Sequence, residues 1–214
     1  MLGELWKKGN LALKESLRVF LVRHGETPWN ARGLYQGHSN IPLNNMGRQQ
    51  ARVAAQKMMA EGISHIYTSD LRRARETAAI IQEQVGCKRV TTLENLRELN
   101  FGAWEGLTFG AIQEKYPQLA QCLLTRPEKV IPPGGEDVST LSDRIKKSWN
   151  DIILHNSTGT IAVVTHAGPI RILLGHWLKR GSGAFWNISL PHGGIIYVSF
   201  PTGGGYPKTL IINV

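Results

Sequence analysis

Two runs of consecutive apolar residues mark the centre of the predicted fold. They are residues 18–22, which read RVFLV, and residues 160–165, which read TIAVVT. Short unbroken runs of this kind are typical of strands that are buried on both faces of a parallel sheet. A histidine follows each run almost at once, His24 after Arg23 in the first case and His166 in the second. Because the carboxyl ends of parallel strands share one edge of the sheet, we expect both imidazoles at that edge.

Strand-like runs alternate with amphipathic stretches along the rest of the chain, and this order predicts an α/β fold. We expect a three-layer α/β/α arrangement with a mostly parallel central sheet and an antiparallel strand near the C-terminus. Further strands are predicted at 63–68, 88–92, 195–200 and 208–213. Helices are predicted from Asn44 to about 61, at 71–85 and, in broken pieces, over 107–125. A long helix is predicted from the acidic residues at 136–137 to about 155, and another through 170–177. Ser69 and Asp70 are expected to cap the helix over 71–85.

Length and composition bound the domain organisation. A chain of 214 residues supports one domain with a well-buried core, which we place over 18–214 with an N-terminal lead-in over 1–17. Hydrophobic residues make up 42% and charged residues 19% of the chain, which argues against disorder and repeat architectures. The lead-in is too polar for a secretory signal core, and no run approaches the roughly 18 apolar residues of a membrane span. We therefore expect no membrane partner.

The formal net charge of +9 predicts an anionic partner. The basic residues are scattered, and the sequence has neither a C-x-x-C pair nor an RNA-recognition motif, so nucleic acid is disfavoured as a partner. A small phosphorylated metabolite fits the scattered charge at least as well. Cys87 and Cys122 lie far apart without metal-ligand spacing. Their spacing disfavours a disulfide framework and a cysteine zinc site, and it favours a reducing compartment, the cytoplasm. Whether the chain forms a homodimer is left open.

Two more charged residues lie beyond predicted strand ends, Arg73 after the second strand and Glu98 after the third. Phosphoryl transfer needs a nucleophile in line with the leaving oxygen, cations around the other oxygens and an acid for the leaving group. We assign attack to His24, because a backbone carbonyl can hold one imidazole N–H and leave the other nitrogen free. Arg23, Arg73 and His166 would hold the phosphoryl group, and Glu98 would donate the proton.

Other ionisable residues compete for roles at this edge. The helix over 71–85 begins with three arginines, which the helix dipole disfavours unless an anion binds there. Of these, Arg72 and Arg75 are interpreted as solvated or ion-paired. Glu105 is the main rival of Glu98 for the role of acid. The histidines interpreted as structural or surface residues are His38, His65, His155 and His176. The role of His192, near the last strands, stays undecided.

Several motifs follow one another along the chain: RHGET from Arg23, YQG from Tyr35, SDLRRARETA from Ser69, LRELNFGAWEG from Leu96, PPGGE from Pro132 and THAGPIR from Thr165. In this order they resemble the histidine phosphatase superfamily, in its phosphoglycerate mutase-like branch. The resemblance implies a phosphoglycerate mutase-like fold, a phosphohistidine on His24, Glu98 as proton donor, and no metal or cofactor. The phosphate pocket that it implies is built from Arg23, Asn30, Arg73 and His166. We also expect Gln36, Gly37 and Ala167 to bind the substrate or its phosphate.

The resemblance also narrows the reaction. The motif from Leu96 is similar to phosphatases, which favours hydrolysis of a phosphomonoester over mutase action. Taken together, the motifs most resemble α-ribazole-phosphate phosphatases and broad phosphomonoesterases. Asp70 stands where proline is common, and Asn40 stands where aspartate is common and could alter substrate contacts.

Other function classes stay open. One is a mutase-type phosphotransferase, and another is a non-catalytic binder of phosphorylated ligands on the same scaffold. A metallophosphatase is disfavoured because no Asp/His cluster with ligand spacing appears in the sequence.

Overall fold

The structure is a computed structural model that describes residues 16–178, 188–201, 206–207 and 209–212. Of the lead-in predicted over 1–17, only Ser16 and Leu17 fall within these ranges. Leu17 already belongs to the first strand, β1, so the boundary drawn after residue 17 cuts into the sheet.

Six strands of the described part of the chain form one sheet in the order β3-β2-β4-β1-β5-β6. The strands are β1 (Leu17–Arg23), β2 (His65–Ser69), β3 (Val90–Leu93), β4 (Gly159–Thr165), β5 (Ile195–Phe200) and β6 (Thr209–Ile212). The first four are parallel to one another, whereas β5 pairs antiparallel with both β1 and β6. The predicted fold class is confirmed, with the two apolar runs at the centre of the sheet.

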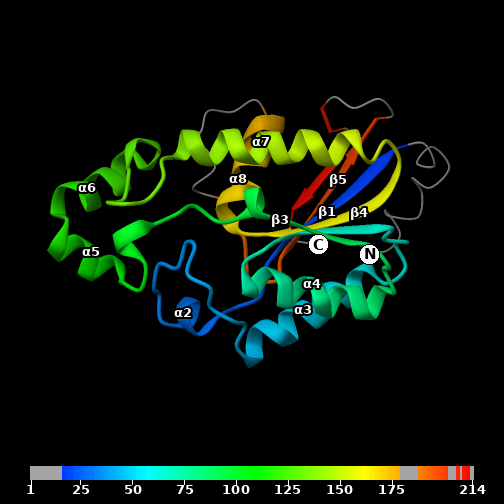
Figure 1. The fold of residues 1–214 in the computed structure, drawn as a ribbon, viewed down its shortest axis with the longest axis horizontal. Helices are drawn as coiled ribbons and strands as arrows, with labels where there is room; N and C mark the ends of the chain where they lie inside the picture. Colours follow the sequence, from blue (N-terminus) through cyan, green and yellow to red (C-terminus); the bar gives the residue numbers. More distant parts are fainter. Residues whose placement is uncertain (1–15, 179–187, 202–205, 208, 213–214) are drawn as a thin grey trace.

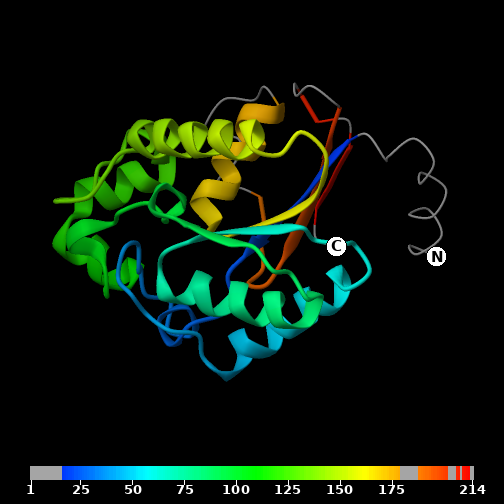
Figure 2. The same ribbon diagram turned by 45° about the vertical axis from the view of Figure 1, so that its right-hand side comes forward.

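Helices cover both faces of this sheet (Figure 1). One pair, α3 (Asn45–Met58) and α4 (Arg72–Val85), covers one face, and the pair α7 (Val138–Leu154) and α8 (Ala167–Leu178) covers the other. The same three layers are visible in the turned view of Figure 2. In β1, Leu17, Val19 and Leu21 join the core beneath α7 and α8, while Phe20 and Val22 join the core beside α3 and α4. Successive side chains of a strand point to opposite faces, so an unbroken apolar run supplies both cores.

A small helical region lies outside the three layers, at the side of α2 (Pro28–Ala31) (Figure 1). It contains α5 (Phe109–Lys115) and α6 (Pro117–Thr125), which are broken apart at Pro117 as the sequence predicts. Two short 3-10 helices accompany it, η3 (Gly102–Trp104) and η4 (Pro127–Lys129), whereas η2 (Glu94–Leu96) packs against α7 and β2. A separate core around the fully buried Trp104 holds this region together.

The start of α4 differs from the prediction. Helix α4 begins at Arg72, and neither Ser69 nor Asp70 caps it, so the predicted cap is wrong. Asp70 instead accepts hydrogen bonds from Arg97, at 2.8 Å to Nε. The side-chain oxygen of Asn40 accepts the Arg72 N–H at 2.7 Å from a distant loop. A tertiary contact therefore supplies the capping interaction that the local sequence lacks.

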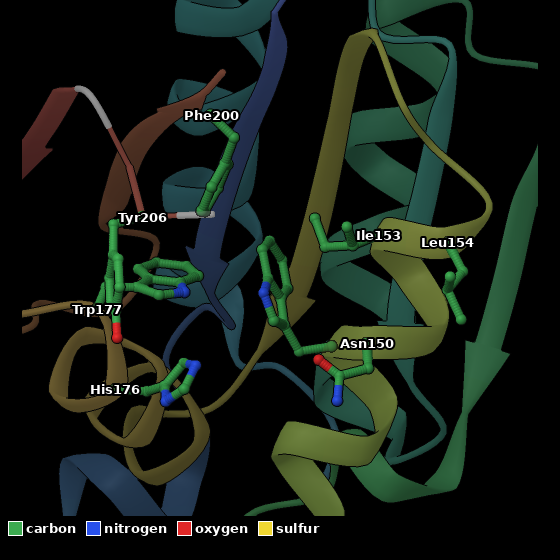
Figure 3. A pocket seen from close by; sticks show the side chains of 8 residues that line it. Asn150, Ile153, Leu154, His176, Trp177, Phe200 and Tyr206 are labelled. Atoms are coloured by element: carbon green, nitrogen blue, oxygen red, sulfur yellow. The ribbon is translucent and has the colours of Figure 1, made fainter. Parts of the chain in front are cut away.

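Aromatic side chains cluster at the end of the sheet that lies away from the two histidines. Trp149 of α7, Trp177 of α8 and Phe200 of β5 pack ring against ring, with centroids 5.0 to 5.3 Å apart. They line a cavity of about 510 Å³ together with Tyr206 (Figure 3). Phe200 pairs with Leu17, at the opposite end of β1 from His24. This cavity is therefore one strand length away from the paired histidines.

A close backbone approach fixes the turn after β1, and it can be tested. A Cβ on Gly47, in the first turn of α3, would lie 2.1 Å from the Glu26 carbonyl oxygen. Backbone atoms cannot move aside as a side chain can, so Gly47→Ala should lower the free energy of unfolding by about 1 to 3 kcal/mol. The control is Gly110→Ala in α5, where the nearest atom is 3.9 Å away. That change should be neutral or stabilising by up to about 1 kcal/mol. Urea unfolding measures both, and equal effects would contradict the steric argument.

Candidate active site

The register of two parallel strands brings two histidines together. Arg23 at the end of β1 pairs with Thr165 at the end of β4, and the His24 N–H donates to the Thr165 carbonyl oxygen at 2.9 Å. The residue that follows β4 is His166, and the imidazole rings of His24 and His166 lie with their centroids 5.0 Å apart. Both side chains are buried, at 3% and 0% exposure. The strand ends thus place His24 and His166 side by side at the carboxyl edge of the sheet.

The guanidinium of Arg73 lies between these rings. It comes from the first turn of α4 and is fully buried. Its Nε is 3.3 Å from His24 Nε2 and 3.2 Å from His166 Nδ1. Its two terminal nitrogens donate to the carbonyl oxygens of Ser39, at 2.9 Å, and Gly37, at 2.7 Å. Every nitrogen of Arg73 is thereby held in place, with one edge of the guanidinium directed at the histidines.

Hydrogen bonds select the proton positions on both imidazoles. His24 Nδ1 lies 2.7 Å from the Gly25 carbonyl oxygen, so it carries the proton and leaves the Nε2 lone pair toward Arg73. His166 Nε2 lies 2.9 Å from the Ser69 hydroxyl, with its Nδ1 toward Arg73. Burial, reinforced by the Arg73 charge, holds the pKa of both imidazoles well below the usual range. Both rings are therefore neutral near pH 7.

Arg23 is the second cation at the site, and His192 holds it. Arg23 donates through one terminal nitrogen to the Leu190 carbonyl oxygen, and its other terminal nitrogen is 2.7 Å from His192 Nε2. Burial lowers the pKa of Arg23 to about 10, so the guanidinium stays charged at neutral pH. Burial and the Arg23 charge lower the pKa of His192 to about 4, which keeps this imidazole a neutral acceptor. The ring of His192 lies 5.8 Å from that of His24.

The sequence left His192 undecided, and the structure places it against Arg23, beside the pocket and not in its described lining. In the sequence, His192 belongs to none of the quoted motifs. The signal that could have identified it was its position just before β5, the strand that pairs with β1. An antiparallel partner of β1 begins where β1 ends, so residues preceding β5 lie beside Arg23.

Glu98 supplies the carboxylate of the pocket. Its oxygen Oε1 accepts the N–H groups of Leu99, at 2.9 Å, and Gly168, at 3.1 Å, which fix its position above the strand ends. Among the described residues that line the pocket, Glu98 is the acidic one. Glu105 does not line it, and its carboxylate instead accepts the N–H groups of His38 and Ser39, each at 2.7 Å. The geometry therefore favours Glu98 over Glu105 as the acid.

Two amides add hydrogen-bond donors to the pocket. The side-chain oxygens of Asn30 and Gln36 accept from Thr27, at 3.1 Å from its N–H and 3.0 Å from its hydroxyl. Within the described residues, the NH₂ group of each amide makes no hydrogen bond, so both remain available to a ligand oxygen. Gly37 also lines the pocket, and Ala167 is buried at the start of α8, next to His166.

The pocket is small, with a volume of about 200 Å³. Its described lining consists of Arg23, His24, Asn30, Gly33, Leu34, Tyr35, Gln36, Gly37, Arg73, Glu98 and Phe101. This lining comes from four parts of the chain, residues 23–24, 30–37, 73 and 98–101, and Arg73 connects it to His166. The roles assigned to these residues stay predictions.

The remaining candidates lie elsewhere. Arg72 pairs with Glu76 at 2.7 Å, and Arg75 is exposed. None of the four histidines interpreted as structural belongs to the described lining of the pocket, although His38 Nε2 lies 3.0 Å from the Glu98 carbonyl oxygen. Across the described ranges, no helix is long and apolar enough to span a bilayer.

Comparison with known proteins agrees with this geometry. Residues 19–213 match the family model of the histidine phosphatase superfamily (branch 1). The chain is 41% identical over 157 residues to Phosphoglycerate mutase-like protein 4 of Arabidopsis thaliana, which covers 72% of this chain and 68% of that protein. It is 31% identical over 171 residues to Phosphoserine phosphatase 1 of Hydrogenobacter thermophilus. This alignment covers 80% of this chain and 81% of that protein.

The fold is also found among solved structures. The crystal structure of the alpha-ribazole phosphatase from Shigella flexneri superposes with a TM-score of 0.83 at 23% identity, over 92% of this chain and 96% of that one. At this identity the likeness concerns the fold alone. Some relatives are longer than this chain, which spans 53% of the length of three mycobacterial proteins. The family match over residues 19–213 shows that the chain belongs to the histidine phosphatase superfamily, branch 1.

Proposed function

We propose that the protein hydrolyses the phosphate monoester of a small metabolite through a phosphohistidine on His24. One observation carries this proposal. The Nε2 lone pair of His24 points into a cationic pocket, 3.3 Å from Arg73 Nε, while its Nδ1 is tied to a backbone carbonyl. A neutral imidazole held in this tautomer is a nucleophile aimed at the site where a phosphate would sit.

The first half-reaction forms the phosphohistidine. His24 Nε2 attacks phosphorus, and the bond between phosphorus and the ester oxygen breaks as the nitrogen–phosphorus bond forms. Glu98, in its protonated form, gives its proton to the departing alkoxide, which leaves as an alcohol. The proton stays on Nδ1 of His24, and its hydrogen bond to the Gly25 carbonyl oxygen stabilises the positive charge that develops on the ring.

The phosphoryl oxygens are held by the groups around His24. Arg23 and Arg73 are charged, and each charge pair at about 4 Å contributes on the order of 4 kcal/mol at an effective dielectric constant near 20. The NH₂ groups of Asn30 and Gln36 and the backbone at Gly37 and Ala167 complete the proposed cradle, and the ring of His166 lies beside it, against Arg73. Preorganised donors of this kind stabilise the charge of the transition state without having to reorganise.

The second half-reaction returns His24 to its starting state. A water molecule attacks the phosphohistidine and gives a proton to the Glu98 carboxylate. The nitrogen–phosphorus bond breaks, its electron pair returns to Nε2, and inorganic phosphate leaves. Glu98 is thus the acid in one step and the base in the next.

The choice of substrate rests on the sequence motifs and not on the geometry of the pocket. We propose α-ribazole 5′-phosphate as the first substrate to examine, because the motifs resemble those of α-ribazole-phosphate phosphatases. The alternative is a mutase-type phosphotransferase, which the name of the Arabidopsis relative favours. It would pass the phosphoryl group to a second hydroxyl rather than to water. Phosphate release from several monoesters without added 2,3-bisphosphoglycerate separates the two, since a strict phosphotransferase releases little phosphate under these conditions.

The nucleophile is tested by His24→Ala. This variant should fold but lose phosphate release from p-nitrophenyl phosphate by about 10⁴-fold or more, because no other group replaces the attacking nitrogen. Brief exposure of the wild type to radiolabelled substrate should trap an acid-labile, alkali-stable label, which His24→Ala lacks. The control is His176→Ala, at an exposed position of α8. Turnover by His24→Ala within tenfold of the wild type would rule out this nucleophile.

The proton donor is tested by Glu98→Gln, which keeps an oxygen to accept from Leu99 and Gly168. For an alkyl phosphate such as glycerol phosphate, kcat/KM should fall by about 10² to 10⁴-fold, because the alkoxide leaves poorly without a proton. For p-nitrophenyl phosphate the loss should stay below about tenfold, since nitrophenolate needs no acid. The ratio kcat/KM reports the first half-reaction alone. Equal losses on both substrates would exclude Glu98 as the donor.

The hold of His192 on Arg23 is tested by phosphate binding. His192→Ala removes the acceptor of one Arg23 N–H and should weaken binding of inorganic phosphate about tenfold or more. His192→Gln places an amide oxygen near the same position and should stay within about threefold of the wild type. Isothermal titration calorimetry at pH 7 measures both. Wild-type affinity in His192→Ala would show that Arg23 does not depend on this contact.

A further inference from the structure

Glu105 makes a set of contacts that the proposed reaction does not use. It follows η3, and its carboxylate accepts three hydrogen bonds from one short segment of the loop after α2. The His38 N–H donates to Oε1 and the Ser39 N–H to Oε2, each at 2.7 Å, and the Ser39 hydroxyl donates to Oε2 as well. Glu105 therefore fixes the segment 37–39 through hydrogen bonds to both of its carboxylate oxygens.

The same segment holds Arg73 from its other side. The carbonyl oxygens of Gly37 and Ser39 accept the two terminal nitrogens of the Arg73 guanidinium. The Gly37 carbonyl and the His38 N–H belong to a single peptide group. That peptide group thus donates to a carboxylate at one end and accepts from a guanidinium at the other. A hydrogen-bonded carboxylate polarises the peptide group and makes its carbonyl oxygen a stronger acceptor.

The close packing at Gly37 makes this arrangement specific. Gly37 has a φ of 40°, and a Cβ at this position would lie 2.1 Å from Glu105 Oε1 and 2.8 Å from the Leu99 carbonyl oxygen. A side chain here would displace the carboxylate from the segment. Glycine thus allows Glu105 to approach the peptide group that holds Arg73.

We propose that Glu105 is a positioning residue for the phosphoryl-transfer site, which it serves by fixing the peptide group between Gly37 and His38 and, through it, the guanidinium of Arg73. The inference rests on the proposed function, since it takes Arg73 as the group that holds the phosphoryl oxygens between His24 and His166. Glu105 itself does not touch the pocket, so it acts through the loop and not on the substrate.

The electrostatics of Arg73 agree with this role. Burial lowers the pKa of Arg73 to about 10, and the nearby carboxylates of Glu98 and Glu105 oppose that shift. Glu105 thus favours the charged guanidinium without contacting it, so it takes up none of the N–H groups of Arg73. A carboxylate in direct contact with Arg73 would instead occupy the N–H groups that a phosphate needs.

The first test is Glu105→Gln, which keeps the size of the side chain but loses the charge and replaces one acceptor oxygen with a donor. We expect kcat/KM for p-nitrophenyl phosphate to fall about 10- to 100-fold. The matched control is Glu76→Gln. Glu76 also braces this loop, accepting the Leu43 N–H at 3.1 Å, but it does not contact the segment that holds Arg73. That variant should stay within about twofold of the wild type, because a neutral amide can still accept the Leu43 N–H. Equal losses in both variants would overturn the proposal.

A double-mutant cycle separates positioning from general stabilisation of the fold. Arg73→Lys cannot donate to both carbonyl oxygens in the plane of a guanidinium. In the Arg73→Lys background, Glu105→Gln should therefore lower kcat/KM by less than about threefold, because coupled residues give non-additive effects. Multiplicative losses would show that Glu105 acts independently of Arg73.

Urea unfolding of each variant identifies any that lose activity by unfolding. If Glu105→Gln does not fold, Ser39→Ala, which removes one donor to Glu105, takes its place in the same cycle.

Phosphate binding keeps the inference distinct from the proposed function. If the wild type turns over no monoester, the proposed function fails, but inorganic phosphate can still report on Arg73. Glu105→Gln should then weaken phosphate binding about tenfold in calorimetry, and Glu76→Gln should leave it unchanged. Wild-type affinity in Glu105→Gln would overturn the role of Glu105, whatever the turnover.

Discussion

The site depends on the parallel register between β1 and β4. Arg23 and Thr165 are opposite each other. The residues that follow them, His24 and His166, therefore lie side by side at the carboxyl edge of the sheet. A slip of one residue would turn the side chains of β1 to the opposite faces and move Leu21 and Val22 into the wrong cores. Because both strands are central and buried on both faces, hydrophobic packing specifies this register strongly. The packing energy of the core thereby fixes the distance between the two imidazoles.

The basic groups at this edge are held by neutral partners. Arg73 donates to two backbone carbonyl oxygens and Arg23 donates to one, and among the described residues no carboxylate forms an ion pair with either guanidinium. A carbonyl oxygen fixes the direction of a guanidinium but does not cancel its charge. The two imidazoles stay neutral because burial and the arginine charge oppose their protonation. The pocket therefore combines two fixed positive charges with the lone pair of a neutral imidazole, and this combination suits attack on a phosphate dianion.

The loop between α2 and α3 serves this arrangement more than any other segment. Its carbonyl groups hold Arg73, its Gln36 lines the pocket, and its Asn40 caps α4, the helix that carries Arg73. Asn40, where the resemblance to the family leads us to expect aspartate, therefore acts at the start of α4. An asparagine oxygen accepts the Arg72 N–H as a carboxylate would, without adding a negative charge beside the pocket.

Local sequence patterns by themselves determined the fold class, the central strands and most of the residues that the structure brings together around His24. His24 and His166 could be identified because each directly follows an apolar run, and Asn44 because it precedes an amphipathic stretch, where it caps α3. Arg73 and Glu98 could be identified because each lies beyond the end of a predicted strand, and the motifs of the family agreed with both. In each case the signal lies within a few neighbouring residues, where chain geometry links sequence to structure.

Only the tertiary structure decided which side chains meet across long stretches of chain. His192 reaches Arg23 over 169 positions, and Glu105 reaches Ser39 over 66. The cap of α4 comes from Asn40, 32 positions before Arg72, and not from the neighbouring Ser69 or Asp70. Such partners follow from how loops pack against the sheet and its helices. No periodicity or local propensity records that packing, because it depends on the positions of all the elements at once.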